Sequence, residues 1–237
     1  MNQNTQTPYV EEAPVTSAGG FASVEFAENP EPRCACILVL DTSGSMQGPP
    51  IDQLNAGLRS FKDELLSDAL AAKRVEIAVL TFGDSPKLVA DFTDAANFEP
   101  PHLVVSGQTP MGAAIEDALS RLAVRKEMYR SNGVAYYRPW VFLITDGEPT
   151  DDYQSAAKSV REGEARGAFS FYAVGVSDAN LQKLREIAPA NRPPVKLDGL
   201  RFRDLFVWLS KSMRTVSRST IGQAVTLDAP GWITTQA

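Results

Sequence analysis

The sequence predicts a doubly wound α/β fold, with a mainly parallel sheet, one antiparallel edge strand and helices on both faces. Apolar runs typical of buried strands alternate almost throughout with segments whose apolar residues recur at helical spacing. Right-handed crossovers between parallel strands place the intervening helices on both faces of the sheet. A short Gly-Asp-Ser-Pro turn at residues 83–86 predicts the antiparallel edge, because parallel strands need a longer connection.

The first half of the chain begins this alternation with an apolar strand over Ile37 to Leu40. Prolines at 49 and 50 then mark a helix start, since proline is favoured in the first helical turn. The next strand is expected from Val75 to Phe82, and the antiparallel edge strand near Leu88 to Phe92. Two parallel strands, a crossover helix and an edge hairpin therefore account for roughly the first hundred residues.

The second half continues with helices and strands in turn. We expect a helix after Pro110, a strand ending before Asp146, a helix near Tyr153 to Arg166, a strand from Phe169 to Val176, a short helix from Ala179 to Ile187 and a short strand from Val195 to Leu197. The last predicted helix has a strong amphipathic pattern, and its apolar face comprises Phe202, Leu205, Phe206, Leu209, Met213 and Val216.

The 237 residues are enough for one large domain with a sizeable core. Residues 1–20 have no periodic apolar pattern, so we expect a mobile tail there. We assign residues 21–219 to the domain, with a short added strand over Phe21 to Phe26, at a sheet edge or in a hairpin. Residues 220–237 form a C-terminal extension that could be strand-like.

The charge of the chain limits its partners. A net charge of -6 argues against nucleic-acid binding, which depends on neutralising phosphates, and gives no support to an anionic membrane surface. No segment approaches the roughly 18 apolar residues of a spanning helix, and the amino terminus lacks a basic start followed by an apolar stretch. We therefore expect a cytoplasmic protein.

The two cysteines, Cys34 and Cys36, lie two residues apart on the first predicted strand. Packing in a buried strand is the favoured interpretation, because buried thiols are common. A redox or soft-metal role is the alternative. Zinc would want about four ligands of this kind, and His102 is the only histidine.

Oxygen-bearing side chains follow the predicted carboxyl ends of two strands and precede one helix. Asp41, Ser43 and Ser45 follow the first strand, Thr109 lies in a turn before a helix, and Asp146 follows another strand. The carboxyl ends of parallel strands meet at one edge of the sheet. Serine and aspartate are also common in turns and caps, but three such turns at one edge favour a metal site. Hydroxyl and carboxylate oxygens suit Mg²⁺, Mn²⁺ or Ca²⁺.

These residues lie in three motifs, D-x-S-x-S, T-P-M-G and L-I-T-D-G, in that order. Together the motifs resemble the von Willebrand factor A (VWA) domain and its metal-ion-dependent adhesion site (MIDAS), over roughly Arg33 to Ser219. The resemblance implies that the two serines and the threonine contact the metal directly, while the two aspartates hold it partly through water. It also implies an open coordination position that attracts an Asp or Glu of a partner.

Two flanking segments, 29–33 and 136–140, look like those of bacterial tellurium-resistance-associated VWA proteins of the TerY type. This resemblance implies a stress-response setting with kinase- or phosphatase-like proteins as partners. The sequence therefore predicts a non-enzymatic, metal-dependent protein–protein interaction module. Mg²⁺ is the expected ion, with Mn²⁺ or Ca²⁺ as alternatives.

The alternative function is a Mg²⁺-dependent phosphoryl-transfer enzyme of the haloacid-dehalogenase type. Such enzymes use a D-x-D pair, in which the first acid is the nucleophile. Here Ser43 stands in place of the second acid, and no lysine lies in an evident phosphate-clamping motif. A nucleotide-binding Rossmann domain is also disfavoured, because the chain has neither G-x-G-x-x-G nor a P-loop lysine.

Two further charged clusters are each open to two interpretations. The first is an acidic loop, expected to cap the following helix, with a second cation site as the alternative. It comprises Glu148, Asp151 and Asp152. The second is a basic group on the last helix, expected to be a solvated face, with a docking patch for an acidic partner as the alternative. It comprises Lys211, Arg214 and Arg218.

Overall fold

The central strands are continuous apolar runs because helices cover both faces of the sheet. The computed structural model describes residue 26, residues 28–223, and residues 225 and 227. Its strands are β1 (Cys34–Asp41), β2 (Val75–Phe82), β3 (Lys87–Asp94), β4 (Trp140–Thr145), β5 (Ser170–Gly175) and β6 (Val195–Lys196). Every residue of β1, β2 and β4 is buried.

The helical segments alternate with these strands along the chain. They are the 3₁₀ turn η1 (Gly44–Met46) and the helices α2 (Pro49–Leu66), α3 (Ala69–Arg74), α4 (Met111–Ser131), α5 (Gln154–Ala165), α6 (Leu181–Ile187) and α7 (Phe202–Arg218). Within the described residues, none of these helices is both long and apolar enough to cross a membrane.

The strands form one six-stranded sheet in the order β3-β2-β1-β4-β5-β6. All neighbouring pairs are parallel except β2 and β3, which are antiparallel. The prediction of a mainly parallel sheet with one antiparallel edge strand is therefore confirmed. In the register of β1 with β4, Leu40 lies beside Ile144, so the residues that follow these two strands emerge together.

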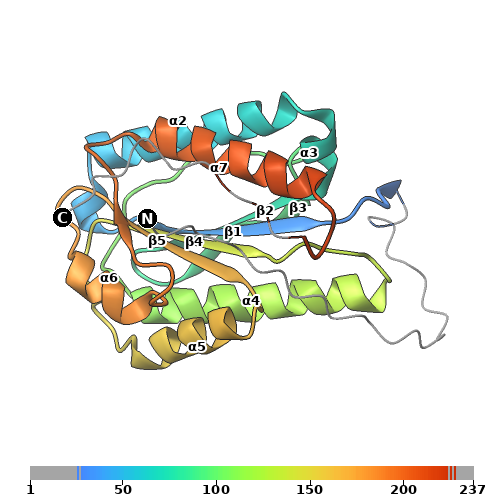
Figure 1. Ribbon diagram of the computed structural model, residues 1–237. Helices are drawn as coiled ribbons and strands as arrows, with labels where there is room; N and C mark the ends of the chain where they lie inside the picture. The colour runs from blue at the N-terminus through green and yellow to red at the C-terminus, as the bar shows by residue number, and fades with distance from the viewer. Residues whose placement is uncertain (1–25, 27, 224, 226, 228–237) are drawn as a thin grey trace.

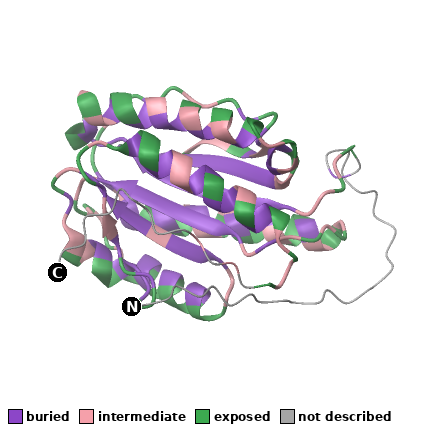
Figure 2. Cartoon of the chain, turned by 45° about the horizontal axis from the view of Figure 1, so that its top comes forward, coloured by how far each residue is buried: buried purple, intermediate pink, exposed green. Residues whose placement is uncertain are grey.

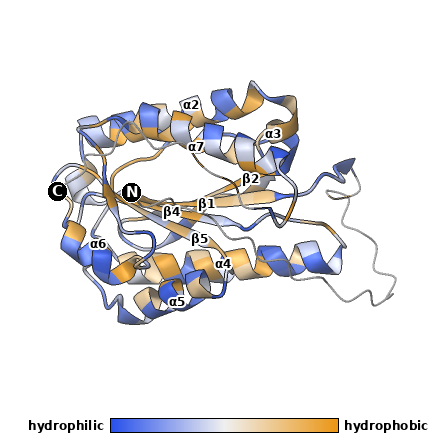
Figure 3. Cartoon of the chain, in the orientation of Figure 1, coloured by the Kyte–Doolittle hydropathy of each residue, from blue (hydrophilic) through white to orange (hydrophobic). Residues whose placement is uncertain are grey.

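Helices α2, α3 and α7 cover one face of the sheet, and α4, α5 and α6 cover the other (Figure 1). The buried strands and the inward stripes of the helices form two cores, one on each face (Figure 2). The buried strands β1 and β4 are among the most hydrophobic segments (Figure 3). Gly57 lets α2 and α7 approach closely, because a Cβ there would lie 2.5 Å from the Phe206 ring.

Three details differ from the sequence predictions or lie outside the described residues. Helix α3 was not predicted; its N-cap residue is Asp68, whose carboxylate accepts hydrogen bonds from the amides of Leu70 and Ala71. The expected strand at residues 21–26 is wrong at Phe26, which is helical and buried. Residues 21–25 and the predicted tail at 1–20 lie outside the described residues.

The C-terminal extension shows no strand in its described residues, which are 220–223, 225 and 227. Ile221 and Gly222 form a turn instead. Ile221, Val225 and Leu227 are partly buried against the core on the α2 and α7 face. The described residues of the extension therefore contact the core through single apolar side chains.

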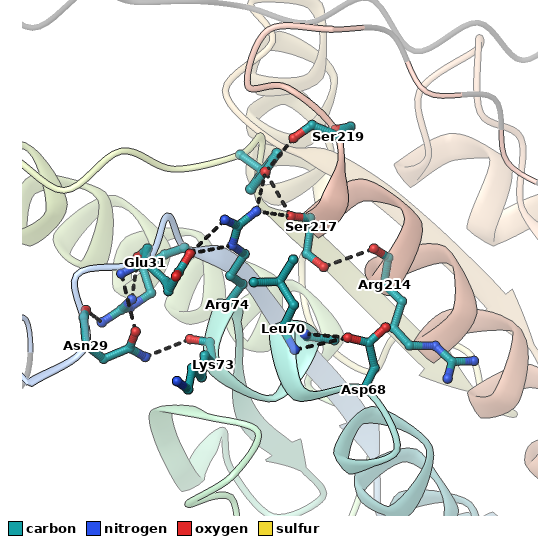
Figure 4. A network of polar contacts seen from close by, with 12 residues as sticks. Asn29, Glu31, Asp68, Leu70, Lys73, Arg74, Arg214, Ser217 and Ser219 are labelled. Atoms are coloured by element: carbon teal, nitrogen blue, oxygen red, sulfur yellow. Dashed lines mark hydrogen bonds and ion pairs between the residues drawn. The ribbon is translucent and has the colours of Figure 1, made fainter.

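The C-terminal end of α7 is held to α3 and to the segment before β1 (Figure 4). Arg74 pairs with Glu31 at 2.7 Å and donates a hydrogen bond to the Ser217 carbonyl at 2.6 Å. The Tyr137 hydroxyl donates to the same carbonyl at 2.9 Å. This group of contacts satisfies a helix-terminal carbonyl that would otherwise lack a partner.

The basic group of α7 is partly engaged in ion pairs. Arg218 pairs with Asp68 at 2.6 Å, and Arg214 pairs with Glu64 at 3.7 Å, while Lys211 is exposed. Two of the three cations therefore join α7 to the α2–α3 region, so the described contacts give the docking-patch interpretation no support.

Candidate metal centre

Asp41 is the last residue of β1, and its side chain is fixed from two directions. It is fully buried, and its Oδ1 accepts a hydrogen bond from the Ser43 amide at 2.8 Å. The Thr145 hydroxyl, at the end of β4, donates to its Oδ2. Sequence analysis missed Thr145, although a hydroxyl directly before Asp146 was a usable signal.

The two serines connect β1 to β4. The hydroxyl oxygens of Ser43 and Ser45 lie 3.0 Å apart. The Ser45 hydroxyl donates to Asp146 Oδ1 at 2.6 Å, across 101 positions of sequence. Four of the five predicted residues therefore form one continuous chain of contacts at the carboxyl edge of the sheet.

Thr109, the fifth predicted residue, is brought to this edge by the turn before α4. It is buried, and its carbonyl accepts a hydrogen bond from the Thr150 amide at 2.9 Å. A Cβ on Gly147 would lie 3.1 Å from Thr109 Oγ1 and 3.6 Å from Asp41 Oδ2. The threonine hydroxyl and the aspartate oxygen therefore border the same space. This space stays open because residue 147 is a glycine and has no side chain.

The two aspartates carry charge that no described cation balances. Burial raises the pKa of Asp41, and nearby Asp146 raises it further. The hydrogen bonds from Ser43 and Thr145 lower the pKa, but they do not outweigh these two effects. Burial also raises the pKa of Asp146, although the hydrogen bond from Ser45 lowers it in part. Neither carboxylate makes an ion pair with another described residue. A bound divalent ion would relieve both desolvation and repulsion.

The donor set fits a hard divalent cation. In the part of the chain that the structure describes, no group of three or more His, Cys, Asp or Glu side chains is placed to hold a metal. Any metal at this edge therefore relies on hydroxyl oxygens beside the two carboxylates. Oxygen donors of this kind suit Mg²⁺, Mn²⁺ or Ca²⁺, with water completing about six ligands.

The acidic loop after Asp146 caps two helices. The Asp152 carboxylate accepts from the Gln154 amide at 2.9 Å, at the start of α5, as predicted. For Asp151 the prediction is wrong, because its carboxylate accepts from the amides of Gly112 and Ala113 at the start of α4. This cap ties the turn that carries Thr109 to the loop after β4.

The remaining acid of this loop and the cysteines lie outside the contact chain. Glu148 accepts from the Asn180 side chain at 2.7 Å. Cys34 and Cys36 are free and buried in the sheet. Burial, with Glu76 nearby, raises the pKa of Cys34 to about 12, so this thiol stays protonated and unreactive at neutral pH. These observations agree with the packing interpretation of the cysteines.

The chain matches the family model of the von Willebrand factor type A domain over residues 36–199. It is also similar to the human collagen alpha-6(VI) chain, with 27% identity over 158 residues. That match covers 64% of this chain and only 6% of the collagen chain. Beyond the shared domain, this chain therefore corresponds to little of that relative.

Solved structures show the same fold. The pilus adhesin SpaC from Lactobacillus rhamnosus GG matches with a TM-score of 0.62 at 13% identity, covering 77% of this chain and 30% of that one. A von Willebrand factor type A protein from Catenulispora acidiphila matches with a TM-score of 0.57 at 18% identity, covering 78% and 43%. Proximal thread matrix protein 1 from the mussel byssus, described with a zinc-occupied MIDAS motif, matches with a TM-score of 0.51 at 20% identity, covering 79% and 45%.

Proposed function

The chain is a member of the von Willebrand factor type A domain family, and we propose that it is a non-enzymatic module that binds a partner protein through a divalent metal. Domains of this family typically mediate protein–protein interactions. The proposed ligands are Asp41, Ser43, Ser45, Thr109 and Asp146. The observation that carries the proposal is the contact chain from Asp41 to Asp146, which gathers carboxylates without a cation to balance them.

The proposed coordination leaves the ion with most of its charge. The two serines and the threonine contact the ion directly, and the aspartates hold it partly through water. Because hydroxyls are neutral, an Asp or Glu of the partner gains more at the open position than at a neutralised ion. Mg²⁺ is the proposed ion, with Mn²⁺ or Ca²⁺ as alternatives; the zinc named for the mussel protein adds a fourth ion to test.

The setting is a further part of the proposal. The resemblance of residues 29–33 and 136–140 to TerY-type proteins supports a stress-response or tellurium-resistance system with kinase- or phosphatase-like partners. A cytoplasmic location is part of the same proposal. No observation favours the haloacid-dehalogenase alternative. Ser43 replaces the second acid of that mechanism, and its hydroxyl contacts the Ser45 hydroxyl.

A metal titration tests the site. We expect Mn²⁺ to bind at one site per chain in calorimetry, and Thr109→Ala to weaken it at least tenfold, because it removes a ligand that comes from a separate turn. Thr42→Ala is the matched control; Thr42 is buried beside the same loop, but its hydroxyl donates to the Phe82 carbonyl. Equal Mn²⁺ affinity in wild type and Thr109→Ala would remove Thr109 from the site.

Partner binding is tested by capture on the immobilised full chain from host extract. We expect a specific protein to be retained in Mg²⁺, released by EDTA and lost with Thr109→Ala but kept with Thr42→Ala. Substituting the acidic residues of the captured protein should then identify the carboxylate that reaches the ion. Retention by Thr109→Ala in EDTA would mean that recognition uses another surface.

A further inference from the structure

Helix α4, which follows the turn of Thr109, has no cap from its own N-cap residue. That residue is Pro110, which makes no side-chain hydrogen bond to the helix, and the first turn contains no acidic residue. Helices α3 and α6 differ, because their N-cap residues Asp68 and Asn180 each accept hydrogen bonds from two amides of the first turn. The first amides of α4 therefore depend on water or on an acceptor from elsewhere in the chain.

Asp151 supplies this acceptor from the loop that follows β4. Its Oδ1 accepts from the Gly112 amide at 3.0 Å, and its Oδ2 accepts from the Ala113 amide at 2.8 Å. One carboxylate thus satisfies two consecutive amides across 39 and 38 positions of sequence. The helix dipole favours an anion at this end, so a carboxylate is a strong cap. The cap of α4 therefore comes from the same loop as Asp146, a proposed metal ligand.

Thr150 joins this loop to the backbone of Thr109 itself. Its amide donates to the Thr109 carbonyl at 2.9 Å, and its hydroxyl oxygen accepts from the Thr109 amide at 3.2 Å. Both backbone polar groups of Thr109 therefore contact the loop after β4. A proposed ligand from the α4 turn is thereby fixed to the loop that carries another proposed ligand, Asp146.

The close packing at Gly112 keeps the loop and the helix in this arrangement. A Cβ at residue 112 would lie 2.5 Å from the Asp152 carbonyl oxygen and 2.9 Å from Tyr153 Cα. Both are backbone atoms, so rotating a side chain cannot relieve the clash. Glycine is therefore needed at the end of the T-P-M-G motif because the loop backbone approaches the helix here.

We propose that Asp151, together with Thr150 and Gly112, is a positioning group for the metal centre. These three residues, which we term the clamp, fix the Thr109 hydroxyl relative to the Asp146 carboxylate. A ligand on a mobile turn loses conformational freedom when the ion binds, whereas a ligand on a held turn has lost it already. The clamp rests on the proposed metal site and adds residues that act on the ion through Thr109 rather than by touching it.

Mn²⁺ calorimetry on the full chain tests the positioning role. Asp151→Ala should weaken Mn²⁺ binding about fivefold, less than Thr109→Ala does, because it loosens a ligand that the chain still has. Asp151→Asn keeps an acceptor oxygen and should recover part of the affinity. Asp152→Ala is the matched control, because Asp152 lies in the same loop but caps α5 through the Gln154 amide at 2.9 Å. It should change the Mn²⁺ affinity less than about twofold.

Two further variants separate positioning from charge. Gly112→Ala changes no charge and should weaken Mn²⁺ binding, because the added methyl group pushes the loop backbone away from α4. Alanine is otherwise the better helix former, so helix propensity would not explain this loss. In a Thr109→Ala background, Asp151→Ala should weaken binding by less than about twofold more, because the ligand that it positions is absent.

Amide hydrogen exchange in EDTA gives a measurement that does not depend on metal. Asp151→Ala should speed the exchange of the two amides that lose their acceptor. It should also speed the exchange of the Thr109 amide, whose own acceptor is the Thr150 hydroxyl, because the whole turn becomes mobile. Asp152→Ala should leave exchange at Thr109 unchanged.

The variants also separate the clamp from the metal site itself. Wild-type Mn²⁺ affinity in Asp151→Ala, with weakened binding in Thr109→Ala, would overturn the positioning role and leave the metal site in place. Equal losses in Asp151→Ala and Asp152→Ala would mean that charge alone acts, and full additivity of Asp151→Ala with Thr109→Ala would mean that Asp151 acts independently of Thr109. Either result overturns the positioning role. Absence of Mn²⁺ binding by the wild-type chain would overturn the metal site and the clamp together.

Discussion

The two ends of the sheet treat buried carboxylates differently. At the amino end, Glu76 is fully buried between Arg33 at 2.7 Å and Arg125 at 2.9 Å. At the carboxyl end, the equally buried Asp41 receives hydrogen bonds only from neutral groups, and Asp146 raises its pKa further. The same sheet therefore carries one acid with two cations beside it and another with none among the described residues.

This difference separates buried acids that already have a cation partner from buried acids that an external cation could complete. Glu164 follows the first pattern, because it pairs with Arg138 and Arg192 and accepts a hydrogen bond from the Phe171 amide. Burial alone therefore does not mark a site, since buried acids occur at both ends. A buried acid that lacks a cation partner and has a raised pKa is the better indicator, because an external cation can complete it.

The largest predicted effect concerns Glu76. Glu76→Gln should lower the free energy of unfolding by about 3–5 kcal/mol, because it leaves Arg33 and Arg125 buried without a carboxylate. Urea denaturation measures the loss. Asp41→Asn makes the same chemical change at the other end and, without metal, should cost less than about 1 kcal/mol, because it removes an uncompensated charge. Equal losses would contradict the distinction between the two ends.

The second largest predicted effect is the stabilisation of the folded protein by bound metal. Mg²⁺ at a hundredfold excess over its Kd should stabilise the wild-type protein by about 2.7 kcal/mol, because the ion binds only the folded state. Melting curves with Mg²⁺ and with EDTA measure this shift. Glu76→Gln should keep the increment and Asp41→Asn should lose it. Identical melting midpoints in saturating Mg²⁺ and in EDTA would contradict the proposed metal site.

The smallest effect concerns Asp68 at the amino end. Burial disfavours its charge, but the amides of Ala71 and Leu70, together with Arg218, outweigh burial and lower its pKa below 3.8. Its ionised form therefore stabilises the fold above pH 3.8, and this contribution is lost as the pH falls through the lowered pKa.

Asp68→Asn keeps a capping side chain and should cost at most about 1 kcal/mol at pH 7, because Arg218 is largely exposed. The difference from wild type should shrink as the pH falls below 3.8. Urea denaturation at a series of pH values measures it. A difference that grows in acid would mean that the charge of Asp68 does not stabilise the fold.

Much of the fold could be predicted because its signals are local. The second strand has the predicted bounds, Val75–Phe82, since a mostly apolar run marks a strand covered on both faces, although Glu76 and Thr81 interrupt it. Helix α7 begins at the first residue of the predicted apolar face, Phe202. The five proposed ligands were also found locally, because each lies at the end of a strand or the start of a helix. Their role as metal ligands stays a prediction.

The sequence by itself therefore determined the order of strands and helices, the family and the edge of the sheet where polar residues gather. The tertiary structure alone decided the partners of each charge. Asp151 caps a helix start 39 positions earlier, Thr145 reaches Asp41 across 104, and Arg125 reaches Glu76 across 49. The physical reason is that hydrophobic periodicity depends only on residues that are close in the sequence. The partner of a buried charge depends instead on which distant side chains the packed sheet brings within hydrogen-bonding distance.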